Sequence, residues 1–213
     1  MTADRPPLPD VDPDGETVAR IRRGEHQLFE VLMRRHNRRL FRVALAILGD
    51  ADDAEDVMQE TYVRAFGALA QFAGQARFAT WLVRIAVHEA LARKRRRMLP
   101  TDATEQVLDD ALGPLEAVST AEVQALIEAA VQRLPAAFRV VFVLRNVEQL
   151  SVQDTAAALG IDEATVKTRA FRARALLRGL LAGTAAEVAP HLFDFPLTRC
   201  DRVVARVLAR LPH

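Results

Sequence analysis

The chain has 213 residues, of which 50% are apolar and 27% are charged, with a formal net charge of +1. At about 150 residues per domain this length predicts one or two domains, and the ordinary apolar fraction excludes wholesale disorder. No run of about 18 uncharged apolar residues occurs, so we expect no membrane span. The single cysteine, Cys200, excludes an internal disulfide and a cysteine-based zinc site within one chain.

Composition divides the chain into segments. The first 15 residues are rich in Pro and Asp and lack the apolar core of a signal peptide, so we expect a disordered start and a cytoplasmic protein. From Met98 to Glu122 the chain has six acids, no Lys and no Arg, which is linker composition. The predicted organisation is a disordered segment 1–15, a domain 16–97, an acidic linker 98–119, a domain 120–182 and a C-terminal extension 183–213.

The first domain has a helical pattern. Apolar residues recur at three-to-four spacing from Leu28, and Gly49 is expected to end that helix. Asp52 or Asp53 is expected to cap the next helix, and Thr80 a third. Because no stretch alternates as a strand does, the predicted fold is all-α, with two small helical bundles joined by the acidic linker, the second ending in a helix-turn-helix.

That helix-turn-helix comes from a specific run of signals. Ser151 can cap a short helix over 152–159, Gly160 can make a tight turn, and Asp162 can cap a longer basic helix. On the longer helix the apolar residues share one stripe, whereas Phe171 is central to the opposite, basic face. A Phe there suits an apolar contact to a thymine methyl or a sugar of DNA. The alternative is a solvated basic helix whose Phe packs on a neighbour.

A second group of aromatic and basic residues ends the first domain. Phe72, Phe78 and Trp81 lie beside a loop of small residues, and the following helix ends in five consecutive basic residues, 93–97. Aromatic rings next to positive charge fit the stacking of unpaired bases along a phosphate-binding surface. The alternative is that Phe78 and Trp81 are core residues and that the basic run is a solvated helix end.

Three motifs, in order, resemble those of the extracytoplasmic-function (ECF) RNA polymerase sigma factors. DAEDVMQETYVRAF (53–66) resembles their second conserved region, FATWLVRIAVHEALARKRR (78–96) their promoter-melting region, and the stretch from LPAAFR to RARALLR (134–178) their fourth region. The resemblance extends over about three quarters of the chain. His88 stands where Asn is usual in the family, and Ala92 where Asp is common.

The resemblance implies three binding surfaces. The second region would dock on the clamp helices of the polymerase β′ subunit through Asp53, Glu55, Asp56, Gln59 and Glu60. The loop before the promoter-melting helix would receive a flipped base of the −10 element, on a surface formed by Phe72, Phe78, Trp81, Arg84, His88, Arg93, Lys94 and Arg95. The fourth region would read the −35 duplex through Lys167, Thr168, Arg169, Phe171 and Arg172, with Arg174 on backbone phosphates.

The implied partners are core RNA polymerase, through its β′ clamp helices and its β subunit, promoter DNA and an anti-sigma factor, with no membrane. The acidic linker would thread the basic active-site and RNA-exit channels of the polymerase, although a plain solvated linker has the same composition.

No catalytic motif is found, so the protein is expected not to be an enzyme and to need neither a cofactor nor a metal. A second hypothesis is a helix-turn-helix regulator that binds DNA alone and carries an N-terminal sensing or dimerisation domain. A third, a protein-binding adaptor, leaves the outward Phe171 unexplained.

The C-terminal extension has an amphipathic end. Thr198 or Asp201 is expected to cap a final helix, and four arginines line another face, Arg199, Arg202, Arg206 and Arg210. Val203, Val204, Val207, Leu208 and Leu211 are expected to face inward. We expect this helix to pack on the second domain or on a partner, and Cys200 to be a buried apolar position. His191 and Cys200 alone do not make a metal site.

Overall fold

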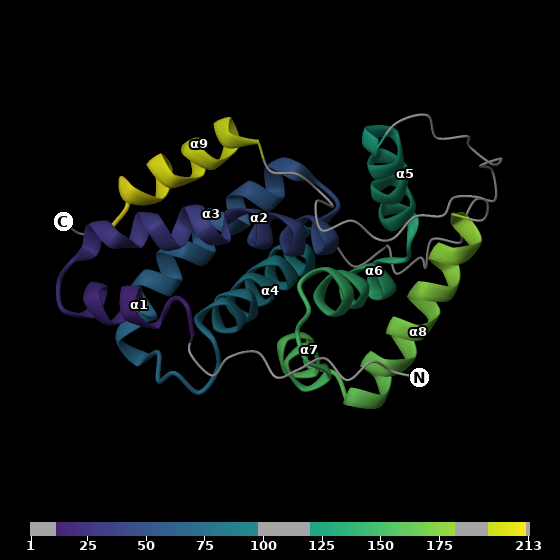
Figure 1. The fold of residues 1–213 in the computed structure, drawn as a ribbon, viewed down its shortest axis with the longest axis horizontal. Helices are drawn as coiled ribbons and strands as arrows, with labels where there is room; N and C mark the ends of the chain where they lie inside the picture. Colours follow the sequence, from purple (N-terminus) through teal and green to yellow (C-terminus); the bar gives the residue numbers. More distant parts are fainter. Residues whose placement is uncertain (1–11, 98–119, 182–195, 212–213) are drawn as a thin grey trace.

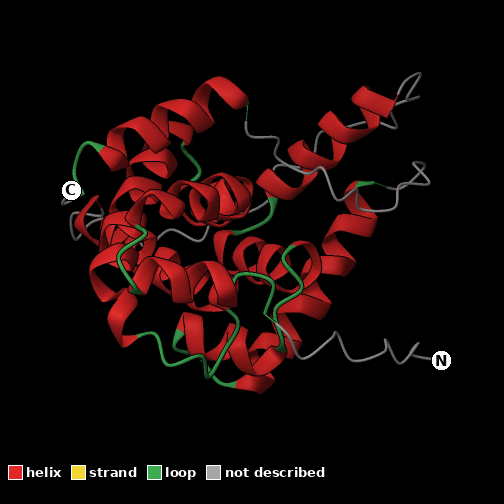
Figure 2. Cartoon of the chain, turned by 60° about the vertical axis from the view of Figure 1, so that its left-hand side comes forward, coloured by secondary structure: helices red, strands yellow, loops and turns green. Residues whose placement is uncertain are grey.

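The computed structural model describes residues 12–97, 120–181 and 196–211, and in these ranges it is helical with no strand (Figures 1 and 2). The first domain contains α1 (Gly15–Arg22), α2 (Phe29–Leu48), α3 (Ala51–Ala68) and α4 (Phe78–Arg97). The second contains α5 (Thr120–Arg133), α6 (Ala136–Phe142), α7 (Val152–Leu159) and α8 (Glu163–Leu180). Short turns of other helix types lie at His26–Leu28, Leu69–Gln71 and Val143–Val147, and α9 (Leu197–Leu208) is the last element. The all-α prediction is confirmed.

The ends of α2 and α3 are set by short local signals. Gly49 ends α2 with a φ of 76°, the left-handed conformation that favours glycine, as predicted. The N-cap of α3 is Asp50, two residues before the nearer of the two predicted caps. Asp50, in extended backbone, accepts hydrogen bonds from the backbone nitrogens of Asp52 (3.1 Å) and Asp53 (2.8 Å). Asp52 and Asp53 are instead the acids of the first turn, where negative charge suits the helix dipole.

The start of α4 depends on a distant residue. Thr80 is not its cap, because the helix already begins at Phe78, whose backbone nitrogen donates to the Asp12 carboxylate at 2.7 Å. Asp14 is buried and contacts Arg35 and His36, with 2.8 Å between the His36 ring nitrogen and its carboxylate. Asp12 and Asp14 therefore contact the first domain, whose predicted start is residue 16. Residues 1–11 and the acidic linker lie outside the described residues.

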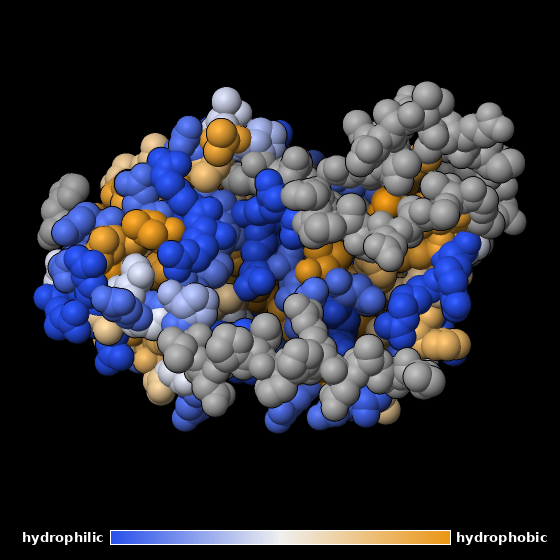
Figure 3. Space-filling view, in the orientation of Figure 1, coloured by the Kyte–Doolittle hydropathy of each residue, from blue (hydrophilic) through white to orange (hydrophobic). Residues whose placement is uncertain are grey.

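The core of the first domain is formed by α2, α3 and α4. Phe29, Tyr62 and Phe78 are fully buried, and the Tyr62 hydroxyl donates to the Met33 carbonyl at 3.0 Å. The Phe29 ring meets Tyr62 and Phe66 edge-on, with centroids 6.1 and 5.1 Å apart. These aromatic contacts fix α2 against α3. On the face of the molecule shown in Figure 3, hydrophilic residues are more extensive than hydrophobic ones.

The two domains pack against each other. Buried residues of the second domain, including Leu144, share one apolar core with α2 and α4. Beside it the Glu148 carboxylate is buried between two guanidinium groups of α2, with Arg39 at 2.7 Å and Arg42 at 3.2 Å. A buried carboxylate needs such partners, so Glu148 marks a specific contact between the domains.

The last helix packs on the first domain. We expected α9 on the second domain or on a partner, but it lies along α2 and α3, with Cys200, Val203, Val204 and Val207 buried (Figure 1). Its N-cap is Pro196, so neither Thr198 nor Asp201 caps it. Cys200 is buried as predicted, and Asn37 donates to its sulfur at 2.9 Å. His191 lies outside the described residues.

Within the described ranges, no helix has the length and apolar character that crossing a membrane requires.

Candidate functional site

The helix-turn-helix is built as its sequence predicts. Ser151 accepts a hydrogen bond from the backbone nitrogen of Asp154 (2.9 Å) and caps α7. Gly160 turns the chain with a φ of 65°, and Asp162 accepts from the Thr165 nitrogen (2.7 Å) to start α8. These bonds lower the pKa of the Asp162 carboxyl below its ordinary value, so the cap carries a negative charge at the positive end of the helix dipole.

One face of α8 is buried and the opposite face is open. Val166, Ala170, Ala173 and Leu177 pack inward. Phe171 is 63% exposed, which is unusual for a large apolar side chain. The other predicted −35 residues share its helix: Lys167, Thr168, Arg172 and Arg174 are exposed, and Arg169 is half-buried. The structure thus brings the six predicted residues to the outer side of one helix.

Arg145 adds positive charge near this face. It donates to the Leu150 carbonyl from the π-helical turn after α6. Burial and the nearby charge of Arg174 lower the pKa of Arg145, which indicates that the two guanidinium groups are close. Arg145 was not predicted from the sequence, because a single Arg in an apolar stretch forms no periodic pattern that indicates which way its side chain points.

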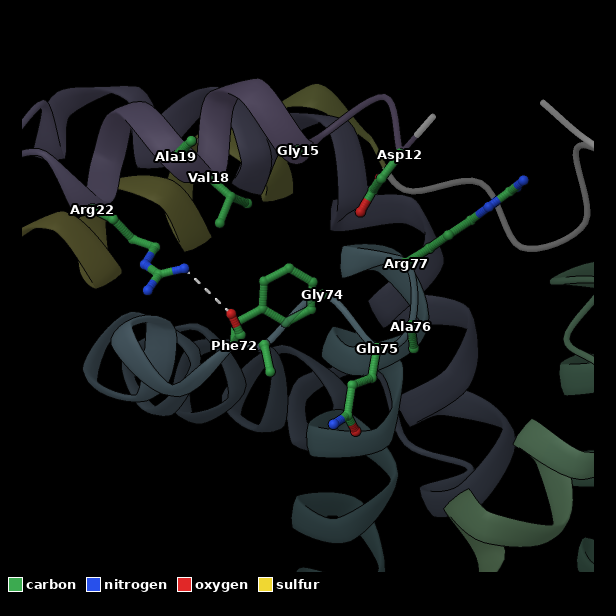
Figure 4. Close-up of a pocket in the computed structure, with 11 residues that line it drawn as sticks. Asp12, Gly15, Val18, Ala19, Arg22, Phe72, Gly74, Gln75, Ala76 and Arg77 are labelled. Carbon is green, nitrogen blue, oxygen red and sulfur yellow. Dashed lines mark hydrogen bonds between the residues drawn. The ribbon is translucent and has the colours of Figure 1, made fainter. Parts of the chain in front are cut away.

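The loop before α4 forms one wall of a cavity of about 460 Å³ (Figure 4). The opposite wall is α1, with Val18, Ala19 and Arg22. Arg22 ties the walls together by donating to the carbonyls of Phe72 (3.4 Å) and Ala70 (3.3 Å). Neither α1 nor Arg22 was expected at this site, since Arg22 has no motif in the sequence to identify it.

The three predicted aromatic residues form a cluster under this loop. Ring centroids are 5.2–5.8 Å apart among Phe72, Phe78 and Trp81. Phe78 is fully buried, Phe72 is 8% exposed and Trp81 is partly buried. In this conformation Phe78 therefore cannot stack on a base. It supports the loop from beneath, which agrees with the alternative that it is a core residue.

The predicted basic residues of α4 differ in their surroundings. Arg84 pairs with Asp154 of α7 at 2.7 Å, so the second domain engages it. Burial and the charge of Arg139 lower the pKa of Lys94, which is half-buried. His88 and Arg95 are exposed. The packed domains therefore cover part of the predicted −10 surface and leave the rest open.

The acidic residues of α3 are held by cations from two sides. On one side, Arg93 of α4 contacts Asp53 at 2.8 Å and Asp56 at 2.7 Å, and Arg97 also pairs with Asp53. Asp53 is buried in this contact, whereas half of the Asp56 side chain stays open to solvent.

On the other side, arginines of α9 pair with two further members of this set. Arg199 and Arg202 contact the buried carboxylate of Glu55, and Arg210 pairs with Glu60 at 3.0 Å. Gln59 is also buried. The five predicted polymerase-binding residues thus lie on one helix but are largely engaged within the chain.

Comparison with known proteins identifies the class to which this architecture belongs. The family model Sigma-70 region 2 matches residues 32–99, and Sigma-70, region 4 matches residues 124–177. The chain is 32% identical over 173 residues to RNA polymerase sigma-H factor of Pseudomonas aeruginosa, covering 76% of this chain and 90% of that protein. It is 34% identical over 168 residues to ECF RNA polymerase sigma factor SigM of Mycobacterium tuberculosis, covering 79% and 84%. The chain belongs to the ECF RNA polymerase sigma factors, which give promoter specificity to transcription initiation.

Solved structures agree with this assignment. CnrH in complex with the cytosolic domain of CnrY aligns with a TM-score of 0.57 and 27% identity, covering 81% of this chain and 99% of that one. The sigma factor RpoE in complex with the anti-sigma factor NepR from Bartonella quintana shares the fold, with a TM-score of 0.54 and 24% identity over 78% of this chain and 99% of that one. The stand-alone regulator is therefore not favoured.

Proposed function

We propose that α3 is the polymerase-docking element of this sigma factor, and that it binds the β′ clamp helices through Asp53, Glu55, Asp56, Gln59 and Glu60. The observation that carries this proposal is the concentration of these side chains on one helix, where they already attract arginines from two neighbouring helices. A face that binds guanidinium groups within the chain has the charge to bind a basic partner surface. The polymerase supplies the chemistry, so this chain needs no catalytic residue of its own.

Promoter recognition is assigned to the other two surfaces. The exposed face of α8 would enter the major groove of the −35 element, with Phe171 on a thymine methyl or a sugar and Arg172 on a base edge. The cavity between α1 and the loop before α4 would receive a flipped base of the −10 element. Exposed His88 and Arg95 would then contact the displaced strand.

Three further assignments follow from the family. The solved relative RpoE is bound to an anti-sigma factor, and we expect an anti-sigma factor for this chain as well. Because its polymerase and its promoters lie in the cytoplasm, we expect it to act there. The linker 98–119 would run through the basic channels of the polymerase, where an acidic segment is attracted by the same charges that hold nucleic acid.

Replacing Asp56 and Gln59 together by Ala tests the docking assignment. Removing a charge and an amide from an interface of this kind should weaken binding to core polymerase about tenfold or more, which corresponds to about 1.4 kcal/mol. The measurement is a competition titration against a housekeeping sigma factor. Glu163→Ala, which removes an exposed acid from the first turn of α8, is the control and should leave the affinity unchanged. Unchanged affinity of the double variant, with unchanged circular dichroism, would contradict the assignment.

A further inference from the structure

Two faces of α9 contact other parts of the chain. Its apolar face, Cys200, Val203, Val204 and Val207, is buried against α2 and α3. Its arginine face meets the acids of α3. The arrangement is visible in Figure 1, where α9 runs alongside α3 at the edge of the first domain. An amphipathic helix with this pairing of faces is held by apolar burial and by charge at the same time.

Glu55 is the centre of the charged contact. Its side chain is only 4% exposed, and its two oxygens accept from Arg199 at 2.7 Å and from the Nε of Arg202 at 3.0 Å. Arg210 holds Glu60 further along α3 at 3.0 Å, and Asp201 of α9 pairs with Arg34 of α2 at 2.6 Å. A buried carboxylate that already accepts from two guanidinium groups is not accessible to a basic partner from outside the chain.

We propose that α9 is an intramolecular competitor of RNA polymerase for the acidic face of α3. This inference rests on the proposed role of α3 in polymerase docking. While α9 is bound, Glu55, Gln59 and Glu60 are covered or paired, so a basic partner helix reaches them only after α9 has moved away. The sigma factor therefore exists in a closed state that does not bind polymerase and an open state that does.

The contact is of a kind that can be displaced. Around the arginine face a small hollow of about 240 Å³ remains between Asp52, Glu55 and Asp56 of α3 and Arg202 and Arg206 of α9, so packing there is incomplete. The exposed ion pairs contribute little, and the buried apolar face supplies most of the stabilisation. Because the observed affinity is the intrinsic affinity multiplied by the open fraction, weakening α9 should tighten polymerase binding.

Cys200 supplies a direct test, because the only cysteine of the chain lies on the buried apolar face of α9. The rate of maleimide labelling at Cys200 is measured in the full chain, alone and with core polymerase, and labelled chain is read by mass spectrometry. We expect slow labelling of the free protein and at least tenfold faster labelling when polymerase is bound. Polymerase that binds the protein while Cys200 stays protected would overturn the proposal.

A pair of variants tests the affinity. Arg199→Ala with Arg202→Ala removes both partners of Glu55 without touching the apolar face, and we expect polymerase affinity to rise three- to tenfold and Cys200 labelling to accelerate without polymerase. Arg206→Ala is the matched control, since it removes a charge from the same helix at a position with no ion pair among the described residues. Equal affinities of the double variant and the wild type would contradict the proposal.

These readouts separate two failures. If neither the wild type nor the Arg199→Ala, Arg202→Ala variant binds polymerase, the docking role of α3 is wrong, and the competitor proposal is wrong with it. If both bind equally and Cys200 stays buried in the complex, polymerase docks with α9 in place and the competitor proposal is wrong. The variant with Asp56 and Gln59 replaced by Ala then decides whether α3 is the docking surface.

Discussion

Phe171 is the most informative of the single residues that we propose to contact the promoter. A ring that is 63% exposed on a basic helix has lost the burial that normally accompanies an apolar side chain. Contact with an apolar part of DNA, such as a thymine methyl, would restore that burial in the complex. We then expect Arg172 to contact a base and Arg174 to contact a phosphate.

Arg172→Ala separates these two roles. A bidentate base contact should contribute about 1–3 kcal/mol to discrimination, so the variant holoenzyme should lose affinity for its own −35 sequence by that amount and lose little on scrambled DNA. Arg174→Ala should weaken both sequences alike and reduce the salt dependence. Binding is measured by fluorescence anisotropy of promoter fragments. An equal loss on both sequences for Arg172→Ala would assign it to the phosphates.

Asp14 makes a pH-dependent contribution to the folding stability of the protein. Burial opposes its charge, but the hydrogen bonds and charges of His36 and Arg35 outweigh burial, so its pKa is lowered below 3.8 in the folded state. Asp14 therefore contributes stability above pH 3.8, and this contribution is lost as the pH falls through the lower folded value. Asp14→Asn should lower the melting temperature at pH 7. The difference between variant and wild type should narrow below pH 3.8, and a gap that stays constant with pH would contradict this role.

At the scale of elements, the turn between α7 and α8 fixes the direction of the recognition helix. Gly160 has a φ of 65°, and an added Cβ there would meet nothing within 4 Å, so only backbone strain opposes a side chain. Gly160→Ala should cost about 1–2 kcal/mol of folding stability in denaturant unfolding. Gly179→Ala, in ordinary helical backbone with equally open space, is the control and should stabilise by up to about 1 kcal/mol. Equal effects of the two would show that the turn is not strained.

Elements were predicted best where the signal is local. Gly49, Ser151 and Asp162 act on backbone within four residues, so their roles could be predicted from the sequence. The cap of α4 could not, because Asp12 reaches Phe78 across 66 residues of chain. The buried stripe of α9 was predicted from its periodicity, but periodicity does not say which domain will cover it.

At the scale of the whole molecule, the two domains are closed on each other. Glu148 lies between Arg39 and Arg42, and Arg84 pairs with Asp154, a residue of the helix-turn-helix domain. The proposed promoter contacts place the exposed face of α8 and the −10 surface of α4 at separate DNA elements. We therefore expect the domains to separate when the protein binds polymerase and promoter.

Glu148→Gln tests this closed arrangement. Breaking a buried ion pair by removing one partner costs about 3 kcal/mol or more, so the domains should separate in a larger fraction of molecules. Small-angle scattering should show a larger radius of gyration for the variant at unchanged helix content. Glu163→Gln, on the exposed start of α8, is the control. A radius equal to that of the wild type would show that Glu148 does not hold the domains together.

The candidate surfaces were predictable as far as motifs extend. The three motif regions located the candidate residues on α3, α4 and α8, because the family resemblance assigns each region a binding partner. That Glu55 and Glu60 pair with arginines of α9 could not be predicted, because the match between these arginines and acids exists only once the chain is folded. The same holds for Arg22 and α1, which complete the cavity beside the −10 loop.

The central claim is that this chain gives promoter specificity to RNA polymerase. The most direct test is to titrate labelled full-length protein with bacterial core RNA polymerase in competition with a housekeeping sigma factor. We expect saturable binding that the housekeeping factor displaces, because both would use the same clamp helices. A folded, monodisperse sample that does not bind core polymerase, or that binds without competition, would contradict it.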